Sequence, residues 1–196
     1  MRSSKRLIAA LIAAVVLMAA VAPVFAGGAG EGEEEIFIPV ISKGFQHQFW
    51  QTVRAGADAA AADLGIDITF EGPPSEADIA DQVQMFQSAM ARNPSAVALA
   101  ALDTNSVLDQ LNEAVTRGIP IVGFDSGVPN APAGAIVANA STNNAAAAGL
   151  AAPEIFAASE DAIAAATTDN PVTFVVLSQD ATSESVTRRG FGFRDA

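Results

Sequence analysis

The stretch IFIPVISKGFQHQFWQTVRAGADAAAADLGIDITFEG, residues 36–72, decides the fold. It begins with a short apolar run, residues 36–41, which predicts a buried strand. Apolar residues then recur at helical spacing over residues 49–64, and Gly65 ends the predicted helix. A second strand is predicted over residues 67–70. Strand, helix and strand in this order predict two parallel strands joined by a right-handed crossover.

The same alternation continues to about residue 140. Apolar runs and helical spacing predict three further strands and two further helices: strands over residues 96–101, 119–124 and 135–138, and helices over residues 79–90 and 107–115. Strands that alternate with helices in this way are typical of a parallel sheet covered on both faces. The sequence therefore predicts an α/β fold, with a doubly wound parallel sheet, for an N-terminal lobe over residues 36–140.

A second, similar unit is predicted to follow this lobe. A helix is expected over residues 143–158, and Pro153 should kink or split it. The run PVTFVVL, residues 171–177, predicts a buried strand, and a further helix is expected from residue 183. These few elements cannot bury a parallel strand on both faces. We therefore expect residues 141–196 to be the truncated start of a second α/β lobe.

The N-terminus predicts export. A basic start (Arg2, Lys5 and Arg6) precedes an apolar run over residues 7–21, and a small residue, Ala26, follows. This order is typical of a cleavable signal peptide, here residues 1–26. The apolar run is shorter than the roughly 20 residues that span a bilayer, and an uncleaved anchor is the alternative. Residues 27–35, GGAGEGEEE, predict an acidic, glycine-rich linker. The expected location is the periplasm or another extracytoplasmic space.

The composition excludes several classes of function. The chain has no cysteine, which excludes disulfides, thiolate metal sites and cysteine nucleophiles, and one histidine argues against a zinc site. All 22 acidic residues but only seven of the ten basic residues lie beyond residue 26, and so acidic a surface repels nucleic acid and anionic lipid. The first strand is not followed by a P-loop or G-x-G-x-x-G, and no G-x-S-x-G elbow occurs. We expect no catalytic residue, no metal, no cofactor and no nucleic acid partner.

The predicted ligand edge lies beyond the carboxyl ends of the strands, where open parallel sheets bind their ligands. Four loops leave those ends: residues 42–48, 72–75, 102–105 and 125–128. They carry carboxylates, amides and hydroxyls, and two aromatic residues stand at the start of the first helix. Such polar groups hydrogen-bond to hydroxyls, and aromatic faces cover the C–H surface of a sugar ring. The inventory favours a neutral polyol as the ligand.

Each candidate residue at this edge has a structural alternative. His47 either caps the first helix through its side chain or contacts the ligand. Phe49 and Trp50 are either core residues packed on the sheet or walls of the binding site. Asp103 either caps the third helix or binds the ligand, and Asp125 either closes a local Asx-turn or binds the ligand. The local sequence leaves these alternatives open.

Three ordered motifs resemble the ribose-type periplasmic sugar-binding proteins, which have the type I periplasmic binding protein fold. They are the stretch from residue 38 to residue 72, the run GIPIVGFDS at residues 118–126, and the R-x-x-G-F spacing that starts at Arg189. The resemblance covers residues 36–196. It implies two similar lobes that close on a sugar, and a loaded form that an ABC transporter permease with its ATPase recognises. We expect a monomer that meets the membrane only through this permease.

The resemblance also implies which residues bind the sugar. The matched positions are His47, Phe49, Trp50, Asp125, Asn144 and Arg189. The first three match a polar residue and two aromatics that sandwich the sugar, and Asp125 matches an aspartate that binds its hydroxyls. Ser126 stands where arginine is frequent, which argues against ribose itself. Asn144 matches a binding amide near the crossing between the lobes, and Arg189 matches an arginine that reaches into the cleft from the second lobe.

The expected function is therefore that of an extracytoplasmic substrate-binding protein, which captures a sugar or similar small polyol between two lobes and delivers it to an ABC permease. The alternative on the same fold is a ligand-sensing protein for a chemoreceptor or sensor kinase. A transcription regulator would need a DNA-reading helix-turn-helix ahead of the sheet, where the predicted signal peptide and linker lie. An enzyme is the weaker rival because no catalytic motif occurs.

Overall fold

The computed structural model describes residues 35–196, and it confirms the α/β fold with a parallel sheet. The five strands are β1 (Phe37–Ile41), β2 (Asp67–Glu71), β3 (Val97–Leu99), β4 (Ile121–Phe124) and β5 (Ile136–Ala140). Their order across the sheet is β2-β1-β3-β4-β5, and every neighbouring pair is parallel. All five strands predicted for the first lobe are present, with ends shifted by at most two residues.

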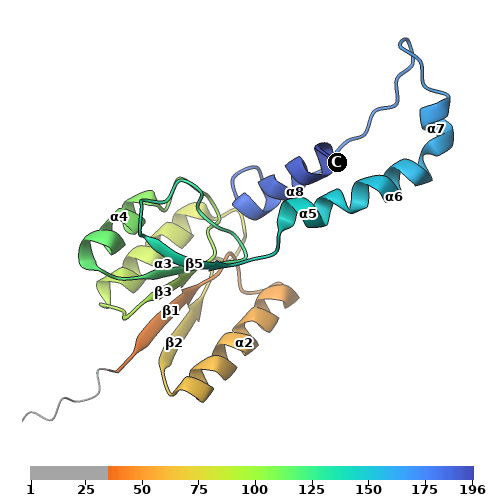
Figure 1. The fold of residues 1–196 in the computed structure, drawn as a ribbon. Coiled ribbons are helices and arrows are strands. Elements are labelled where there is room, and N and C mark those ends of the chain that lie inside the picture. Colours follow the sequence, from red (N-terminus) through yellow and green to blue (C-terminus); the bar gives the residue numbers. More distant parts are fainter. Residues whose placement is uncertain (1–34) are drawn as a thin grey trace, which may run out of the picture. The chain divides into compact units, whose positions relative to one another are not determined.

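Three helices cover the two faces of the sheet. They are α2 (Gln48–Leu64), α3 (Ile79–Ala91) and α4 (Leu108–Arg117). Figure 1 shows α2 on one face and α3 with α4 on the other, as expected for a doubly wound sheet. The helices α2 and α4 end at Gly65 and Gly118, whose φ angles are 65° and 68°. Glycine adopts this left-handed conformation without the penalty that a Cβ would bring.

The hydrophobic core lies between the sheet and the helices α3 and α4. Its largest members are at most 2% exposed: Ile41, Phe86, Met90, Val97, Leu99, Leu111 and Ile121. Each apolar side chain of this size contributes about 1.5–3 kcal/mol when it is fully removed from water. The core therefore fixes α3 and α4 against the central strands, and with them the loops at the carboxyl ends.

A buried glutamine ties two of these loops together. Gln82 is on α3, is 1% exposed, and uses its whole side-chain amide. Its Nε2 donates to the carbonyl oxygens of Ser42 and Ala100, each at 2.9 Å, and its Oε1 accepts from the N–H of Leu102 at 2.9 Å. These three backbone groups follow β1 and β3 directly. One side chain therefore satisfies backbone groups of both strand ends in a place that water does not reach.

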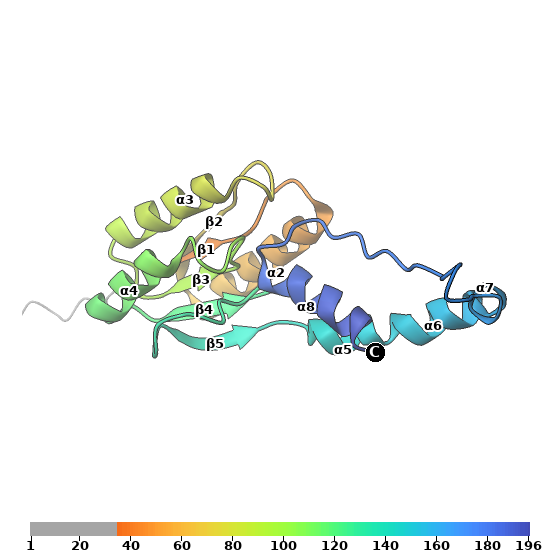
Figure 2. The ribbon, with the colours of Figure 1, turned by 90° about the horizontal axis from the view of Figure 1, so that it is seen from above.

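Residues 141–196 contribute four helices: α5 (Asn144–Gly149), α6 (Ala151–Ala158), α7 (Glu160–Ala164) and α8 (Glu184–Arg194). The expected helix over residues 143–158 is split at Leu150, so that Pro153 lies in the first turn of α6, where its missing N–H has no intrahelical partner to lose. The helix α8 packs along α5 (Figure 1, Figure 2). The contact is close, since a Cβ on Gly192 would lie 2.5 Å from the Cα of Ala145.

The predicted strand over residues 171–177 is wrong. This segment has no regular secondary structure, and its backbone forms no hydrogen bond with another described residue. Val175 and Leu177 are 75% and 92% exposed. The run has strand-forming residues, but a strand also needs a neighbour with which to pair. The sheet ends at β2 and β5, and α8 lies along α5 instead of providing such a neighbour.

The predicted signal peptide, residues 1–26, and most of the predicted linker, residues 27–35, lie outside the described residues. Within residues 35–196, no helix combines the length and the apolar character needed to cross a bilayer. These two predictions about the N-terminus therefore stay predictions.

The role of Gln82 predicts a large effect of a small change. Gln82→Ala should lower the free energy of unfolding by about 2–4 kcal/mol, because it leaves three buried backbone groups without a partner and opens a cavity. Gln84 lies on the exposed side of the same helix, and Gln84→Ala should change stability by no more than about 0.5 kcal/mol. Urea unfolding followed by circular dichroism measures both variants. Equal effects of the two variants would contradict the proposed tie.

Candidate functional site

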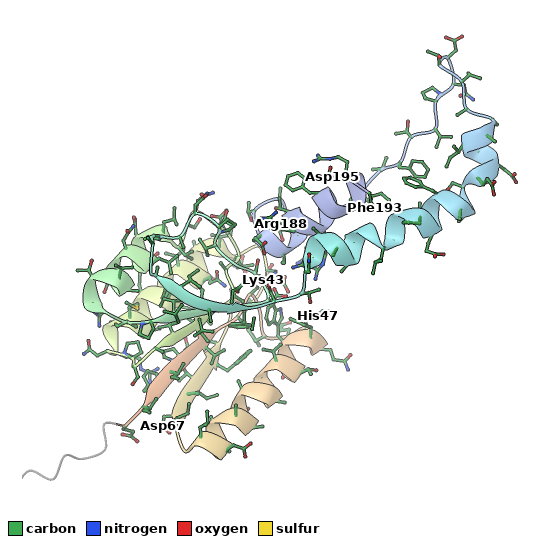
Figure 3. All side chains as sticks on the ribbon, viewed as in Figure 1. Lys43, His47, Asp67, Arg188, Phe193 and Asp195 are labelled. Atoms are coloured by element: carbon green, nitrogen blue, oxygen red, sulfur yellow. The ribbon has the colours of Figure 1, made fainter. Side chains whose placement is uncertain are left out.

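The loops that follow β1, β2 and β4 lie together at one edge of the sheet. Ser42 follows β1 and donates from its N–H to the carbonyl of Glu71 at 2.8 Å and from its Oγ to the same oxygen at 3.0 Å. A Cβ on Gly72 would lie 2.7 Å from the carbonyl oxygen of Gly44, so only glycine fits between these loops. Figure 3 shows Lys43 and His47 at this edge and Asp67 at the opposite end of the sheet.

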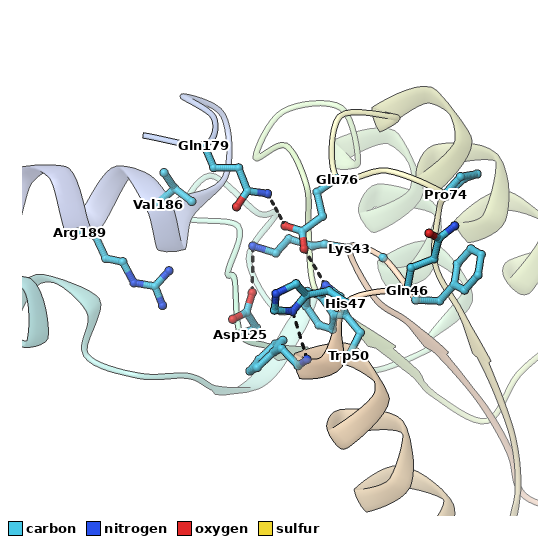
Figure 4. A pocket seen from close by; sticks show the side chains of 13 residues that line it. Lys43, Gln46, His47, Trp50, Pro74, Glu76, Asp125, Gln179, Val186 and Arg189 are labelled. Carbon is cyan, nitrogen blue, oxygen red and sulfur yellow. Dashed lines mark hydrogen bonds and ion pairs between the residues drawn. The ribbon is translucent and has the colours of Figure 1, made fainter. Parts of the chain in front are cut away.

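A hollow of about 480 Å³ opens at this edge (Figure 4). Its lining comes from the first loop and the start of α2, from the loop after β2, from the end of β4, and from the region of α8. The lining residues are Lys43, Gly44, Phe45, Gln46, His47, Phe49, Trp50, Pro74, Glu76, Asp125, Gln179, Val186 and Arg189. The hollow therefore contains His47, Phe49, Trp50, Asp125 and Arg189, five of the seven residues that the sequence proposed for the site.

His47 both caps a helix and lines the hollow. Its Nδ1 accepts a hydrogen bond from the N–H of Phe49 at 3.1 Å, and it is the N-cap residue of α2. The prediction that His47 caps the first helix through its side chain is therefore confirmed, while ligand contact stays a prediction. Because Nδ1 is used by the backbone, the other ring nitrogen, Nε2, is the atom with which this side chain could meet a ligand.

Two adjacent aromatic residues form one wall. Trp50 is 2% exposed, and Phe49 is 46% exposed. Their ring centres lie 4.8 Å apart at 77°, an edge-to-face arrangement. The Nε1 of Trp50 donates to the Oε1 of Glu76 at 2.7 Å. Trp50 is thus a core residue and a wall residue at once, and Phe49 is the ring that a ligand would reach first.

Asp125 follows β4 in a strained turn. The N–H of Ser126 donates to the carbonyl of Phe124, two residues earlier, at 2.5 Å, which closes a γ-turn around Asp125. The φ of Asp125 is 57°, an angle that few residues other than glycine, asparagine and aspartate adopt. Its own N–H donates to the carbonyl of Ala140 at 3.0 Å. The turn is held from both sides and aims the carboxylate at the hollow.

A buried ion pair forms the floor of the hollow. The Nζ of Lys43 lies 3.0 Å from the Oδ2 of Asp125, and the two side chains are 5% and 17% exposed. The same Nζ donates to the Oγ of Ser185 at 3.2 Å and lies 6.0 Å from the centre of the Trp50 ring. Lys43 therefore compensates the charge of Asp125 and joins the loop after β1 to the start of α8.

Arg189 and Asn144, which only the resemblance had identified, differ in their placement. Arg189 lines the hollow from α8, opposite the aromatic wall (Figure 4). Asn144 is the first residue of α5, is 4% exposed, and does not line the hollow. Its buried Oδ1 has no hydrogen-bond partner among the described residues. The structure therefore brings Arg189, but not Asn144, to the other candidates.

Asp103 lies in a separate hollow with Asn105 and Arg188. Its Oδ1 accepts from the N–H of Asn105 at 2.8 Å and from the N–H and Oγ of Ser106 at 2.7 and 2.8 Å. It closes the turn ahead of α4, whose N-cap is Val107. Asp103 does not line the hollow that the other candidates share, and ligand contact by Asp103 stays a prediction. Its carboxylate is occupied by three local donors, and the loop after β3 lies at the same edge of the sheet without lining the hollow.

The environment of Asp103 shifts its titration. Burial by itself raises the pKa of this carboxyl. The Ser106 hydroxyl and the N–H groups of Ser106 and Asn105 stabilise the charged form, and together they outweigh burial and hold the pKa of Asp103 below its usual value. Asp103 is therefore a charged structural residue of its loop at neutral pH.

Three functional candidates escaped the sequence reasoning. Lys43 was visible in the first loop but had no assigned role, because its pairing with Asp125 joins β1 to β4. Glu76 stands one residue beyond the loop that was expected after β2. Gln179 follows the segment that was expected to be a strand, residues 171–177. The rule that polar residues follow the carboxyl ends of strands could have identified Glu76 and Gln179 if those loops had been extended by a few residues.

The hollow combines hydrogen-bonding side chains with an aromatic wall. Charged and amide groups can donate to hydroxyls and accept from them, and Phe49 and Trp50 offer apolar surface next to them. Over residues 35–196, no group of three or more histidine, aspartate or glutamate side chains is placed to hold a metal ion. The arrangement fits a small neutral ligand with several hydroxyl groups.

Known proteins share this organisation. The family model for the periplasmic binding protein domain matches residues 38–196. A solved structure of an ABC transporter, LacI family transcriptional regulator from Brachyspira murdochii is 42% identical, with a TM-score of 0.72 over 82% of this chain and 50% of that chain. An ABC transporter solute binding protein from Agrobacterium vitis with bound D-fucose is 33% identical, with a TM-score of 0.70 over 81% and 52% of the two chains.

A curated protein is also similar to part of this chain. The D-allose-binding periplasmic protein of Escherichia coli (strain K12) is 28% identical over 86 residues, which are 44% of this chain and 28% of that protein. The chain thus spans about half the length of the solved structures that it matches.

The lowered pKa of Asp103 predicts a pH-dependent stability. Asp103→Ala should lower the free energy of unfolding by about 1–2 kcal/mol near neutral pH, because the turn before α4 loses its acceptor. Folding lowers the pKa, so this contribution is complete above the unfolded value of about 4 and is lost as the pH falls through the lower folded value. Urea unfolding near neutral pH and at about pH 2–3 measures the difference.

The matched control is Asp63→Ala, which removes an exposed carboxylate near the end of α2. It should change stability little at either pH. If the deficit of Asp103→Ala were the same in acid as at neutral pH, the carboxylate would not be the stabilising group.

Proposed function

This chain belongs to the periplasmic binding protein domain family, and from that premise we propose that it captures a sugar or similar small polyol in the hollow at the carboxyl ends of its strands. One observation carries the proposal. Phe49 and Trp50 form a wall beside His47, Asp125 and Arg189, so that ring-covering and hydroxyl-binding groups face one space. Its volume of about 480 Å³ is in the range of pockets that enclose small molecules.

Capture requires no chemical step. The ligand would stack its C–H surface on Phe49 and exchange water hydrogen bonds for those of Asp125 and Arg189. Arg189 lies on α8 and Asp125 follows β4, so a ligand that contacts both joins the two parts of the fold. Binding then favours the closed arrangement, by no more than the difference in the ligand's affinity for the closed and open states. The closed, loaded form is what we propose an ABC permease recognises.

The sugar class is supported by the relatives. One matched structure contains D-fucose, and one matched protein is named for D-allose. Both ligands are neutral monosaccharides, which agrees with a hollow whose lysine and aspartate compensate each other. Because this chain spans about half the length of the solved structures, its ligand and its delivery to a permease are proposals.

We propose the same arrangement along the chain that the sequence predicted. Residues 1–26 are a cleavable signal peptide, residues 27–35 a linker, residues 36–140 an N-terminal lobe and residues 141–196 the start of a second lobe. Export through the signal peptide places the protein in the periplasm or another extracytoplasmic space. It acts as a monomer without enzymatic activity, and Asp103 and Asn144 are support residues of the site rather than lining residues.

A thermal-shift screen against a panel of neutral monosaccharides, sugar acids and cyclitols tests the ligand class. A neutral sugar present at about 100 times its Kd should stabilise the folded protein by about 2.7 kcal/mol. A shift with sugar acids alone would overturn the neutral-ligand proposal, and no shift with any compound would remove the sugar-capture proposal for this chain.

Asp125→Asn should weaken binding of the identified sugar by about 1–3 kcal/mol, because a hydrogen bond to a charged acceptor is lost and Lys43 is left without its counter-charge. Asparagine tolerates the left-handed φ of this position, so the turn should persist. Titration calorimetry gives the affinity, and Asp109→Asn on the exposed side of α4 is the control. Unchanged affinity in Asp125→Asn would exclude this carboxylate from the site.

An experiment on cells distinguishes a role in transport from a role in sensing. A strain without this gene should lose uptake of the identified sugar if the protein serves a permease. Intact uptake with a lost chemotactic or transcriptional response to the sugar would favour the sensing alternative.

A further inference from the structure

We propose that Glu76 is a positioning residue that couples the indole of Trp50 to the cover segment, residues 179–186, and so sets how closely this segment lies over the hollow. The cover segment comprises the turn before α8 and the first residues of that helix. It contributes Gln179 and Val186 to the lining. Neither Glu76 nor Gln179 is among the residues that the family resemblance identifies as contacting the sugar.

Glu76 uses its two carboxylate oxygens in different directions. Its Oε1 accepts from the Nε1 of Trp50 at 2.7 Å, and its Oε2 accepts from the Nε2 of Gln179 at 2.9 Å. Figure 4 shows its carboxylate between these two partners. Trp50 and Gln179 are 129 residues apart in the chain. Among the described residues, Glu76 alone connects the aromatic wall with the cover segment through side-chain hydrogen bonds.

The loop that carries Glu76 is well anchored. Ser75 accepts from the N–H of Ala77 through its Oγ at 3.1 Å, which closes a short turn around Glu76. Gly72, at the start of the same loop, lies against the backbone of Gly44 and the hydroxyl of Ser42. An anchored loop with a carboxylate at its tip can hold two partners without moving itself, and this makes Glu76 suitable as a fixed point for the cover segment.

Gln179, the second partner of Glu76, lies just ahead of α8. Asp180 follows Gln179 and accepts through Oδ1 from the N–H groups of Thr182 and Ser183, at 2.9 and 2.8 Å. This turn leads into α8, which carries Arg189. This turn therefore joins Gln179 to the helix that supplies the arginine of the hollow.

The cover segment also contacts the other three loops at the same edge. Thr182 donates from Oγ1 to the carbonyl of Leu102 at 3.2 Å, and the N–H of Ser185 donates to the Oγ of Ser126 at 3.2 Å. Lys43 donates to Ser185, as described above. These contacts should keep the segment folded when the bond to Glu76 is removed, so that a change at Glu76 loosens the segment instead of unfolding it.

The test is an exchange of the two hydrogen-bonding groups. Gln179→Glu places two carboxylates against each other and should open the segment. Adding Glu76→Gln should restore the bridge, because the amide introduced at position 76 keeps an oxygen for the indole and gains an NH₂ that donates to the new carboxylate. Hydrogen exchange of the amides of Thr182, Ser183 and Ser185 in the ligand-free protein should be about two- to fivefold faster in Gln179→Glu and return to the original rate in the double variant.

Asp78→Asn combined with Gln179→Glu is the matched control, since it removes a nearby negative charge of the same loop without touching the bridge. It should not restore slow exchange. Rescue by Asp78→Asn as well as by Glu76→Gln would show a general charge effect and overturn the proposal. Unchanged exchange in Gln179→Glu would overturn it too.

A spectroscopic measurement follows the other end of the bridge. The chain has one tryptophan and no tyrosine, so its intrinsic emission comes from Trp50. Glu76→Ala should move this emission to longer wavelengths, because the indole N–H turns to water, whereas Glu76→Gln should leave it in place. Equal emission in all three proteins would show that Glu76 does not position the ring. The meaning for ligand capture rests on the proposed function, but both measurements need no sugar, and their failure is distinct from a failed sugar screen.

Discussion

The side-chain amide of Gln82 holds the backbone that follows β1 and β3, and the rest of the site depends on this tie. All strands of the sheet run in one direction, so their carboxyl ends meet at one edge, where backbone groups leave the ladder and lose their partners. After β1 and β3 these groups are buried away from water, and Gln82 supplies their partners from α3. The first loop, with Lys43 and His47, then starts from a fixed point.

The charges of the hollow are arranged on this fixed edge. Lys43 is nearly inaccessible to water, and its burial is tolerable because Asp125 lies at 3.0 Å and Ser185 accepts a further hydrogen bond. Asp125 in turn holds a positive φ inside a γ-turn, a conformation that usually carries a penalty and tends to occur at functional sites. Buried pairs of this kind add little net stability, and this pair fixes the positions of the Lys43 ammonium and the Asp125 carboxylate at the floor of the hollow.

The C-terminal third differs from the lobe in how its apolar residues are used. Phe156 packs near Phe174 and Phe193, with ring centres 5.2 and 6.5 Å away, but Leu150, Val175 and Leu177 are mostly exposed. The helices α5 and α8 pack closely at Gly192, whereas the backbone of residues 171–177 forms no hydrogen bond with another described residue. The sequence pattern of a strand is present there, but no neighbouring strand is available for it to pair with. The cover segment, residues 179–186, is held by polar contacts with the loops that follow β1, β2, β3 and β4.

The sequence by itself determined the five strands, the helices between them and the edge at which polar residues gather, because period and turn residues are local properties of the chain. It also identified five residues that line one hollow. Only the tertiary structure decided that Asp103 lines a separate hollow, that Trp50 is both core and wall, that Lys43 pairs with Asp125, and that Glu76 meets Gln179. These outcomes depend on the paths of loops and on contacts between residues far apart in the chain, and no local spacing encodes them. Residues 171–177 have the sequence pattern of a strand but do not form one, because a strand needs a neighbouring strand with which to form hydrogen bonds.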